Sequence, residues 1–249
     1  MRIYTGTVSA VSTPYPGFIR VRLEHKDFRW SRPIGDFYIK ILVGDVPEDL
    51  ESRNLSRREI LQLDILMRTY TIADVGPGWI ELDCVAGHAG PGTDWFRQAE
   101  IGQRLCIIAP DPGEELWAPA LKLPPSCELI AVIDSTAFPA LKNLEAEWEG
   151  PITSLLYGFE IEGYESAHNF EELLSFLDGY LPNEEREVSE QEESECSEDY
   201  LWDMATSSSP TQFFFAGESG MIKKLRRHSL ARGVERTSVS FMGYWRRLE

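Results

Sequence analysis

The chain has 249 residues, of which 43% are hydrophobic and 26% charged, a length that suits one large or two small domains with a real hydrophobic core. Its net charge of −17 disfavours nucleic acids and anionic membranes as partners. No run of about 18 apolar residues occurs, so we expect no stable insertion into a membrane. Residues 1–10 lack the pattern of a signal peptide, which indicates a cytoplasmic protein.

The four cysteines stand singly, with no pair at the C-x-x-C spacing of redox or metal sites. Three of them, Cys84, Cys106 and Cys127, lie in apolar, strand-like runs. We therefore expect reduced, buried thiols rather than disulfides, and no metal site.

The first predicted domain, residues 1–112, is a six-stranded antiparallel β-barrel. Alternating or β-rich runs recur along it, separated by turn signals with glycine and proline at residues 14–17 and 76–78. The runs cover residues 3–9, 18–23, 37–43, 68–73, 79–85 and 104–108. Short strands at this spacing favour a small closed barrel. One helix is expected at residues 56–66, and a shorter one after Gly92.

The second predicted domain, residues 128–249, follows a linker rich in proline and glutamate at residues 113–127. Strands and helices alternate along it, which predicts an α/β domain with a parallel sheet. Its expected strands cover residues 128–133, 152–161, 212–215 and 237–242. Its expected helices cover residues 139–149, 170–177 and 220–231.

Charge is unevenly distributed along this second domain. Residues 184–199 hold nine acids and one base, and residues 219–249 hold eight bases and two acids. The acidic stretch lies within residues 183–209, which have almost no apolar periodicity, so we predict a disordered insertion there. The basic end is either a solvated helix face or a surface that attracts an anionic ligand.

A candidate flavin-binding motif, Arg68-Thr69-Tyr70-Thr71, begins one of the predicted strands. A flavin needs a cation near its pyrophosphate, a flat ring against its isoalloxazine and a small hydroxyl near its N5 atom. In an extended strand Arg68 and Tyr70 share one face, and Thr71 still reaches the same ligand through its backbone. Residues 2–5 repeat the pattern, and we interpret that earlier copy as an ordinary first strand.

A glycine turn, Gly90-Pro91-Gly92-Thr93, follows the next predicted strand. Such a turn opens a short helix and leaves backbone N–H groups available for a phosphate. The alternative is a plain turn capped by Thr93 or Asp94. The position of the turn after the strand motif favours phosphate binding.

Five blocks of the chain together resemble the siderophore-interacting proteins, a family of ferric-siderophore reductases related to the ferredoxin reductases. The blocks are residues 68–71, 83–95, 134–140, 215–218 and 243–246, in the family's order and over nearly the whole chain. The resemblance implies a ferredoxin-reductase-like fold, with FAD on the barrel and NADPH or NADH on the α/β domain. It also implies a ferric siderophore or another ferric chelate as electron acceptor.

The resemblance further implies which residues hold the flavin. Asp83 and His88 match the family's Asp-x-x-x-His stretch, although His88 stands one place later than in the family. Gly90 and Pro91 match its phosphate turn. The residues implied for the flavin are Arg68, Thr69, Tyr70, Thr71, Asp83, Val85, His88, Gly90, Pro91, Gly92 and Thr93.

For the nicotinamide nucleotide, the resemblance implies two turns between a strand and a helix. The chain lacks the Gly-x-Gly-x-x-Gly fingerprint. Ile133 and Ser135 replace the glycine and the glutamate of the family's first turn, Gly-Asp-Glu-Thr-Ala. The residues implied for the nucleotide are Asp134, Thr136, Ala137, Ala216, Gly217 and Glu218.

For the acceptor, the resemblance implies a basic flavin mouth that attracts an anionic chelate. Lys40 matches the first basic position of the family, whereas Asp111 and Ser240 stand at two others. Arg246, near the basic end of the chain, is expected to compensate for these losses.

The leading interpretation is a monomeric, FAD-dependent enzyme that moves electrons from NADPH or NADH to a ferric chelate and releases Fe(II). Because the cofactor does the chemistry, we expect no catalytic side chain. Two alternatives stay open. One is a general flavin-linked reductase with another acceptor, and the other is a flavin- or chelate-binding protein that no longer uses the nucleotide.

Overall fold

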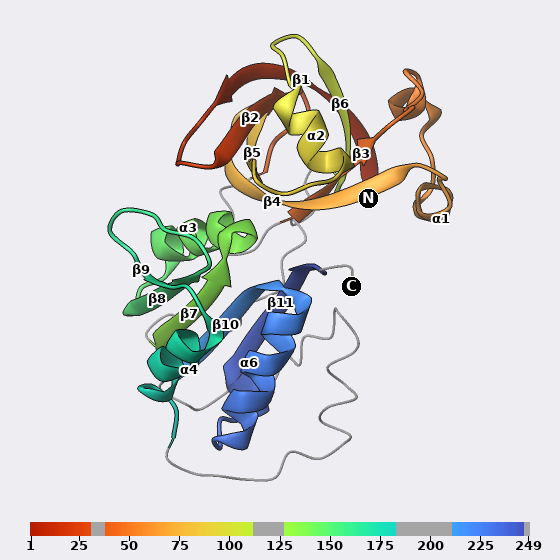
Figure 1. Cartoon of the computed structure of the whole chain (residues 1–249). Helices are drawn as coiled ribbons and strands as arrows, with labels where there is room; N and C mark the ends of the chain where they lie inside the picture. The colour runs from red at the N-terminus through yellow and green to blue at the C-terminus, as the bar shows by residue number, and fades with distance from the viewer. Residues whose placement is uncertain (31–37, 112–126, 183–210, 247–249) are drawn as a thin grey trace. The chain divides into compact units, whose positions relative to one another are not determined.

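The computed structural model describes residues 1–30, 38–111, 127–182 and 211–246 (Figure 1). These residues form two compact units, a β-barrel and an α/β unit. The predicted insertion and all of the predicted linker except Cys127 lie outside the described residues, as do Phe37 and Cys196. No helix in the described ranges is long and apolar enough to cross a membrane.

Within the described residues, the first unit is a closed barrel of six antiparallel strands, which confirms the predicted fold class (Figure 1). The strands are β1 (Arg2–Ser12), β2 (Phe18–Glu24), β3 (Tyr38–Val43), β4 (Leu66–Gly76), β5 (Trp79–Val85) and β6 (Arg104–Ala109). They close in the order β1-β2-β5-β4-β3-β6.

Alternation along β5 shows how the sequence fills this barrel. Ile80, Leu82 and Cys84 belong to the buried apolar core. Glu81 and Asp83 alternate with them and pair with arginines of β2 instead. A side-chain period of two thus separates an apolar interior from a charged outer face.

A segment between β3 and β4 forms η1 (Leu50–Arg53) and α1 (Arg57–Leu61). Ser56 caps α1 in a capping box with Glu59, which fixes where the helix begins. The helix predicted at residues 56–66 is too long, because β4 begins at Leu66 and pairs there with Val43 of β3. Ladder hydrogen bonds outweigh the local helical pattern at this point.

The second unit is built on a parallel sheet in the order β11-β10-β7-β8-β9, as the predicted fold class requires. Its strands are β7 (Glu128–Asp134), β8 (Ile152–Tyr157), β9 (Glu165–Ala167), β10 (Thr211–Glu218) and β11 (Val239–Trp245). Its helical elements are η2 (Ser135–Ala137), α3 (Phe138–Glu147), α4 (Phe170–Asp178), α6 (Ser219–Ala231) and η4 (Arg236–Ser238).

Three details of this unit differ from the prediction. The strand expected at residues 237–242 begins at Val239, because η4 occupies the residues before it. The strand expected at residues 152–161 ends at Tyr157, because Gly158 takes a left-handed φ of 75°. Strand β9 was not predicted, since a run of three residues carries too little periodicity to be recognised.

Parallel pairing places the carboxyl ends of β7, β10 and β11 at one edge of the sheet. These ends are Asp134, Glu218 and Trp245. Ligands of open α/β sheets bind beyond the carboxyl ends of the strands. This edge is therefore a candidate binding site in the second unit.

Candidate functional site

The predicted flavin motif lies on β4, with its side chains in different environments. Arg68 and Thr69 are exposed, Tyr70 is half-buried, and Thr71 is buried. The Tyr70 ring packs against Phe96, with ring centroids 4.9 Å apart. Burial raises the pKa of the Tyr70 phenol, so this hydroxyl stays protonated at neutral pH.

The earlier copy of the motif, at residues 2–5, has a different environment. Tyr4 is fully buried, and its hydroxyl donates to a backbone carbonyl at 2.7 Å. Arg2 lies 3.6 Å from the Asp27 carboxylate. The Arg68 guanidinium donates to a backbone carbonyl of its own strand at 2.9 Å, and no carboxylate among the described residues pairs with it. The later copy thus presents a cation to an incoming anion.

The glycine turn opens α2 (Pro91–Arg97) directly beside the later motif. Gly90 precedes the helix with a φ of 139°, a value that favours glycine. A Cβ on Gly92 would come within 2.6 Å of the Tyr70 hydroxyl and 3.4 Å of the Arg68 Cγ. The structure therefore brings the strand motif and the glycine turn together.

A thiol and two hydroxyls meet at this contact. The Cys84 Sγ lies 3.7 Å from the Tyr70 hydroxyl and 3.6 Å from the Thr93 hydroxyl. Burial raises the pKa of the Cys84 thiol. The three described cysteines are all free, as predicted, although Cys127 is only half-buried.

Arg97, at the end of α2, holds the loop that precedes the glycine turn. Its guanidinium donates to the carbonyls of Ala86 at 2.6 Å and His88 at 3.0 Å, and it pairs with Asp94 at 2.9 Å. His88 is half-buried, and its backbone N–H donates to the Val85 carbonyl at 3.4 Å. Pairing with Arg97 offsets the negative charge of Asp94 beside the predicted phosphate turn.

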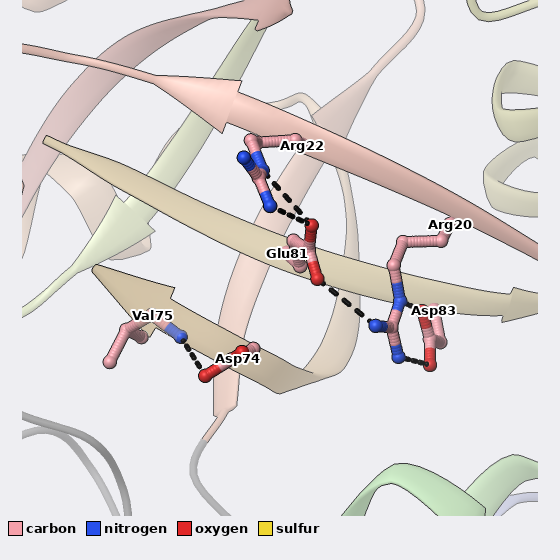
Figure 2. Close-up of polar contacts among 6 residues, drawn as sticks. All are labelled: Arg20, Arg22, Asp74, Val75, Glu81 and Asp83. Atoms are coloured by element: carbon pink, nitrogen blue, oxygen red, sulfur yellow. Dashed lines mark hydrogen bonds and ion pairs between the residues drawn. The ribbon is translucent and has the colours of Figure 1, made fainter. Parts of the chain in front are cut away.

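Asp83 engages an arginine of the neighbouring strand (Figure 2). Arg20 donates to both Asp83 oxygens, at 2.6 and 2.7 Å, and to Glu81 at 3.0 Å, and Arg22 also pairs with Glu81. The Asp83 side chain is 1% exposed, and this burial raises its pKa while Arg20 opposes the shift. Arg20 could not be identified from the sequence, because only the β2–β5 register places it opposite Asp83.

Lys40 lies beside the flavin motif, on β3. It is opposite Thr69 in the β3–β4 ladder, and its Nζ donates to the Thr69 hydroxyl at 3.1 Å. Partial burial lowers its pKa. No carboxylate pairs with Lys40 in the described part of the chain. Two cations, Lys40 and Arg68, therefore lie on adjacent strands without a carboxylate partner in the described ranges.

The predicted nucleotide residues gather at the carboxyl edge of the parallel sheet. At the ends of β7 and β10, and in η2, lie Asp134, Thr136, Ala137, Ala216, Gly217 and Glu218. The Asp134 carboxylate accepts from the Thr136 N–H at 2.8 Å, from the Thr136 hydroxyl, and from the Glu218 N–H at 2.8 Å. Glu218 in turn caps α6. The two predicted turns are thus joined through one carboxylate.

Trp245, which the sequence analysis did not select, completes this edge. Its indole Nε1 donates to Asp134 at 2.8 Å, and its carbonyl accepts from the Ser219 hydroxyl at 2.9 Å. The block at residues 243–246 signalled the region, but a contact that spans two strand spacings cannot be read from spacing in the chain.

The second predicted chelate-binding cation, Arg246, directly follows β11 and is exposed. It belongs to the α/β unit, whereas Lys40 belongs to the barrel. The prediction that both residues bind the ferric chelate rests on the resemblance to the siderophore-interacting proteins.

Two family descriptions match most of the chain. Residues 128–248 match the siderophore-interacting proteins, and residues 7–114 match the siderophore-interacting FAD-binding domain. The ferric acinetobactin reductase of Acinetobacter baumannii is 25% identical over 165 residues, which cover 64% of this chain and 49% of that protein. The chain thus spans about half the length of that relative.

Solved structures with the same architecture cover nearly the whole chain. The siderophore-interacting protein from A. baumannii is 19% identical, with a TM-score of 0.60 over 99% of this chain and 91% of that one. A siderophore utilization protein from T. fusca is 20% identical, with a TM-score of 0.65 over 99% and 93%. A ferredoxin NADP+ reductase from Neisseria gonorrhoeae, with bound FAD and NADP, is 12% identical, with a TM-score of 0.57 over 98% and 100%. These likenesses confirm the ferredoxin-reductase-like fold.

Proposed function

The chain belongs to the siderophore-interacting protein family, and from this premise we propose that it is a cytoplasmic, FAD-dependent ferric-chelate reductase. It takes electrons from NADPH or NADH and passes them to a ferric siderophore or a similar ferric chelate. The FAD-binding domain of the family and the reductases that share the fold support an oxidoreductase built around FAD.

One observation carries this proposal: Arg68 has no carboxylate partner among the described residues and lies beside the glycine turn at Gly92. Lys40 is equally without a carboxylate partner there, one position away in the β3–β4 ladder. Two cations without a carboxylate partner among the described residues are unexpected in a chain of net charge −17, and the register, with Lys40 opposite Thr69 and Ile41 opposite Arg68, turns their side chains to opposite faces of the β3–β4 pair. An anionic ligand beside the glycine turn would supply the missing charge at Arg68.

The residues present fit FAD. Arg68 would hold the pyrophosphate by charge-assisted hydrogen bonds, with backbone N–H groups of Gly92 and Thr93 as further donors. The half-buried Tyr70 would lie against the flavin ring, and Thr71 would position it through the backbone. Arg97 and the Arg20–Asp83 pair would keep the surrounding loop and strand in place.

The residues at the carboxyl edge of the second sheet fit a nicotinamide nucleotide. The turn after β7, with Thr136 and Ala137, opens η2 and α3, and the turn after β10 opens α6. Helix starts at this edge provide N–H donors for phosphate. Asp134 would organise both turns.

A bound flavin would supply the redox chemistry between the nucleotide, a hydride donor, and Fe(III), a one-electron acceptor. The side chains of this chain bind and orient. Lys40 and Arg246 would each attract an anionic ferric chelate by their positive charge. The chelate needs no activation by an acid–base side chain among the described residues.

Anaerobic rapid mixing tests this proposal. The FAD-loaded protein is mixed with NADPH or NADH, then with a ferric siderophore and an Fe(II)-specific chelator. We expect the flavin absorbance to bleach with the nucleotide and to return with the ferric complex as Fe(II) appears. An unchanged spectrum with both nucleotides would indicate a flavin-binding protein that does not use them. Bleaching without reoxidation by any ferric chelate would indicate a reductase with another acceptor.

A further inference from the structure

Asp134 and Trp245 meet across a strand to which neither belongs. Strands β7, β10 and β11 lie side by side, with β10 in the middle (Figure 1). The Trp245 indole nevertheless donates to the Asp134 carboxylate at 2.8 Å. Gly217 of β10, with a φ of 145°, leaves the necessary space, because a Cβ there would come within 2.4 Å of the Asp134 Cγ.

A second contact holds the backbone of Trp245. Gly217 pairs with Gly243, and a register shift then sets Glu218 opposite Trp245. The Ser219 hydroxyl donates to the Trp245 carbonyl at 2.9 Å, and a Cβ on Gly243 would come within 2.6 Å of that hydroxyl. Trp245 is thus held at both its indole and its carbonyl, and glycines make room for both contacts.

The Asp134 carboxylate has no acceptor position left for a ligand. One oxygen accepts from the N–H and the hydroxyl of Thr136, and the other accepts from the Glu218 N–H and the Trp245 indole. An ionised carboxylate offers about four acceptor positions in all. Asp134 therefore acts through the groups it holds, and not by touching a ribose or a nicotinamide.

We propose that the Asp134–Trp245 hydrogen bond, the cross-strand link, holds the turns after β7 and β10 in one arrangement and thereby sets the affinity for the nicotinamide nucleotide. Asp134 and Trp245 are positioning residues in this scheme. Turns that are held before binding need not be ordered by the nucleotide, so the binding free energy is not reduced by an ordering cost. The inference rests on the proposed function, because it takes the nucleotide to bind at this edge.

Trp245→Phe tests the link, because it keeps an aromatic ring and removes the N–H donor, together with part of the ring volume. Trp148→Phe is a matched control, since the Trp148 indole donates to the Cys127 carbonyl at 2.9 Å, just before the other end of β7. We expect Trp245→Phe to raise the calorimetric dissociation constant of NADP+ or NAD+, and the KM for the reduced nucleotide, about tenfold, as for a lost hydrogen bond to a charge. The kcat value, FAD affinity and reoxidation of chemically reduced flavin by a ferric chelate should not change. Trp148→Phe should leave every one of these quantities unchanged.

A double-mutant cycle with Asp134→Asn shows whether Trp245 acts through Asp134. If it does, Trp245→Phe causes no further loss of nucleotide affinity once Asp134→Asn is present. Losses that multiply, or an unchanged nucleotide affinity in Trp245→Phe, would overturn the link. Should Asp134→Asn fail to fold by circular dichroism, the comparison of Trp245→Phe with Trp148→Phe still decides. A parent protein that neither binds nor is reduced by either nucleotide contradicts the proposed function and the link together. If the nucleotide reduces the flavin of the parent protein normally, but the variants keep the parent's nucleotide affinity, only the link is contradicted.

Discussion

Arg20 and Asp83 face each other across the β2–β5 pair and share two hydrogen bonds, of 2.6 and 2.7 Å (Figure 2). The guanidinium of Arg20 thereby balances the negative charge of Asp83 within the barrel wall. Asp83 directly precedes Cys84, whose thiol contacts Tyr70. The resemblance gave Asp83 a place among the flavin residues. Its contacts indicate a role one step removed, in which the pair holds the strand beside the flavin motif.

Removal of Arg20 should therefore destabilise the fold. Arg20→Gln leaves a buried carboxylate without its bidentate partner, and we expect the free energy of unfolding in urea to fall by on the order of 3 kcal/mol. The control is Arg53→Gln, which breaks an exposed pair with Asp49 and should change nothing measurable. Equal effects of the two substitutions would mean that Asp83 does not depend on Arg20.

The stability deficit of Arg20→Gln should also depend on pH. Burial already raises the pKa of Asp83, and loss of Arg20 removes the group that opposes the rise. With a folded-state pKa above the unfolded one, the folded variant gains protons more readily as the pH falls. Its deficit should therefore shrink as the pH falls from 7 toward about 4, the ordinary pKa of aspartate. A deficit that stays constant over this range would contradict the assignment.

Arg68→Ala should weaken FAD binding by about ten- to a hundredfold, because a charge-assisted hydrogen bond to phosphate contributes about 1.5–3 kcal/mol. Arg2→Ala is the control from the earlier copy of the motif. Arg2 pairs with Asp27 and lies over the Tyr4 ring at 5.3 Å, so its loss should leave FAD affinity unchanged. Quenching of flavin fluorescence during titration measures both. Similar losses would show that the two copies are not distinguished as proposed.

The barrel could be predicted because its strands turn apolar side chains toward a common core. An alternation of apolar and polar residues follows directly from that geometry, as along β5. The helix at residues 56–66 was overextended where a ladder competes with a local pattern, since Leu66 pairs with Val43. Local sequence patterns therefore predict that a strand or helix is present better than they predict where it ends.

The side-chain partners could not be predicted, because they depend on register and strand order. Arg20 and Asp83 are 63 residues apart in the chain, and Asp134 and Trp245 are 111 apart. Only the order β11-β10-β7 brings the second pair together. The motifs predict the regions of the two candidate sites. The strand order and register determine that Arg20 and Trp245 make contacts there.

Gly92→Ala should weaken FAD binding about tenfold or more. A Cβ at this position would lie 2.6 Å from the Tyr70 hydroxyl, and such overpacking costs about 1–3 kcal/mol. Gly87→Ala is a matched control, because Gly87 precedes the same turn and a Cβ there meets nothing within 4 Å. Calorimetric titration with FAD compares the two variants. Normal affinity in Gly92→Ala would show that Tyr70 can move without cost.

Alkylation of the thiols should follow their burial. Cys127 is half-buried, whereas Cys84 and Cys106 are buried. Because burial raises the pKa of Cys84, its reactive thiolate forms only at a pH above the ordinary range of a thiol. Of these three cysteines, Cys127 should therefore be the first that iodoacetamide modifies at pH 8, as mass spectrometry of the peptides can measure. Modification of Cys84 at the same rate would mean that the barrel opens readily beside Tyr70.

Lys40→Ala should raise the KM for an anionic ferric chelate about three- to tenfold at low salt, because a cation beside the flavin motif, with no carboxylate partner among the described residues, concentrates anions. Reduction of the flavin by NADPH should hardly change, since the nucleotide turns lie in the other unit. Lys26→Ala removes an exposed lysine of the same barrel and serves as the control. The difference between the two variants should shrink as salt is added, because the Debye length falls to about 8 Å at physiological ionic strength. A neutral chelate should not distinguish them. If Lys40→Ala and Lys26→Ala behave alike with anionic chelates at low salt, the acceptor does not approach along β3, and the chelate must be sought elsewhere on the barrel.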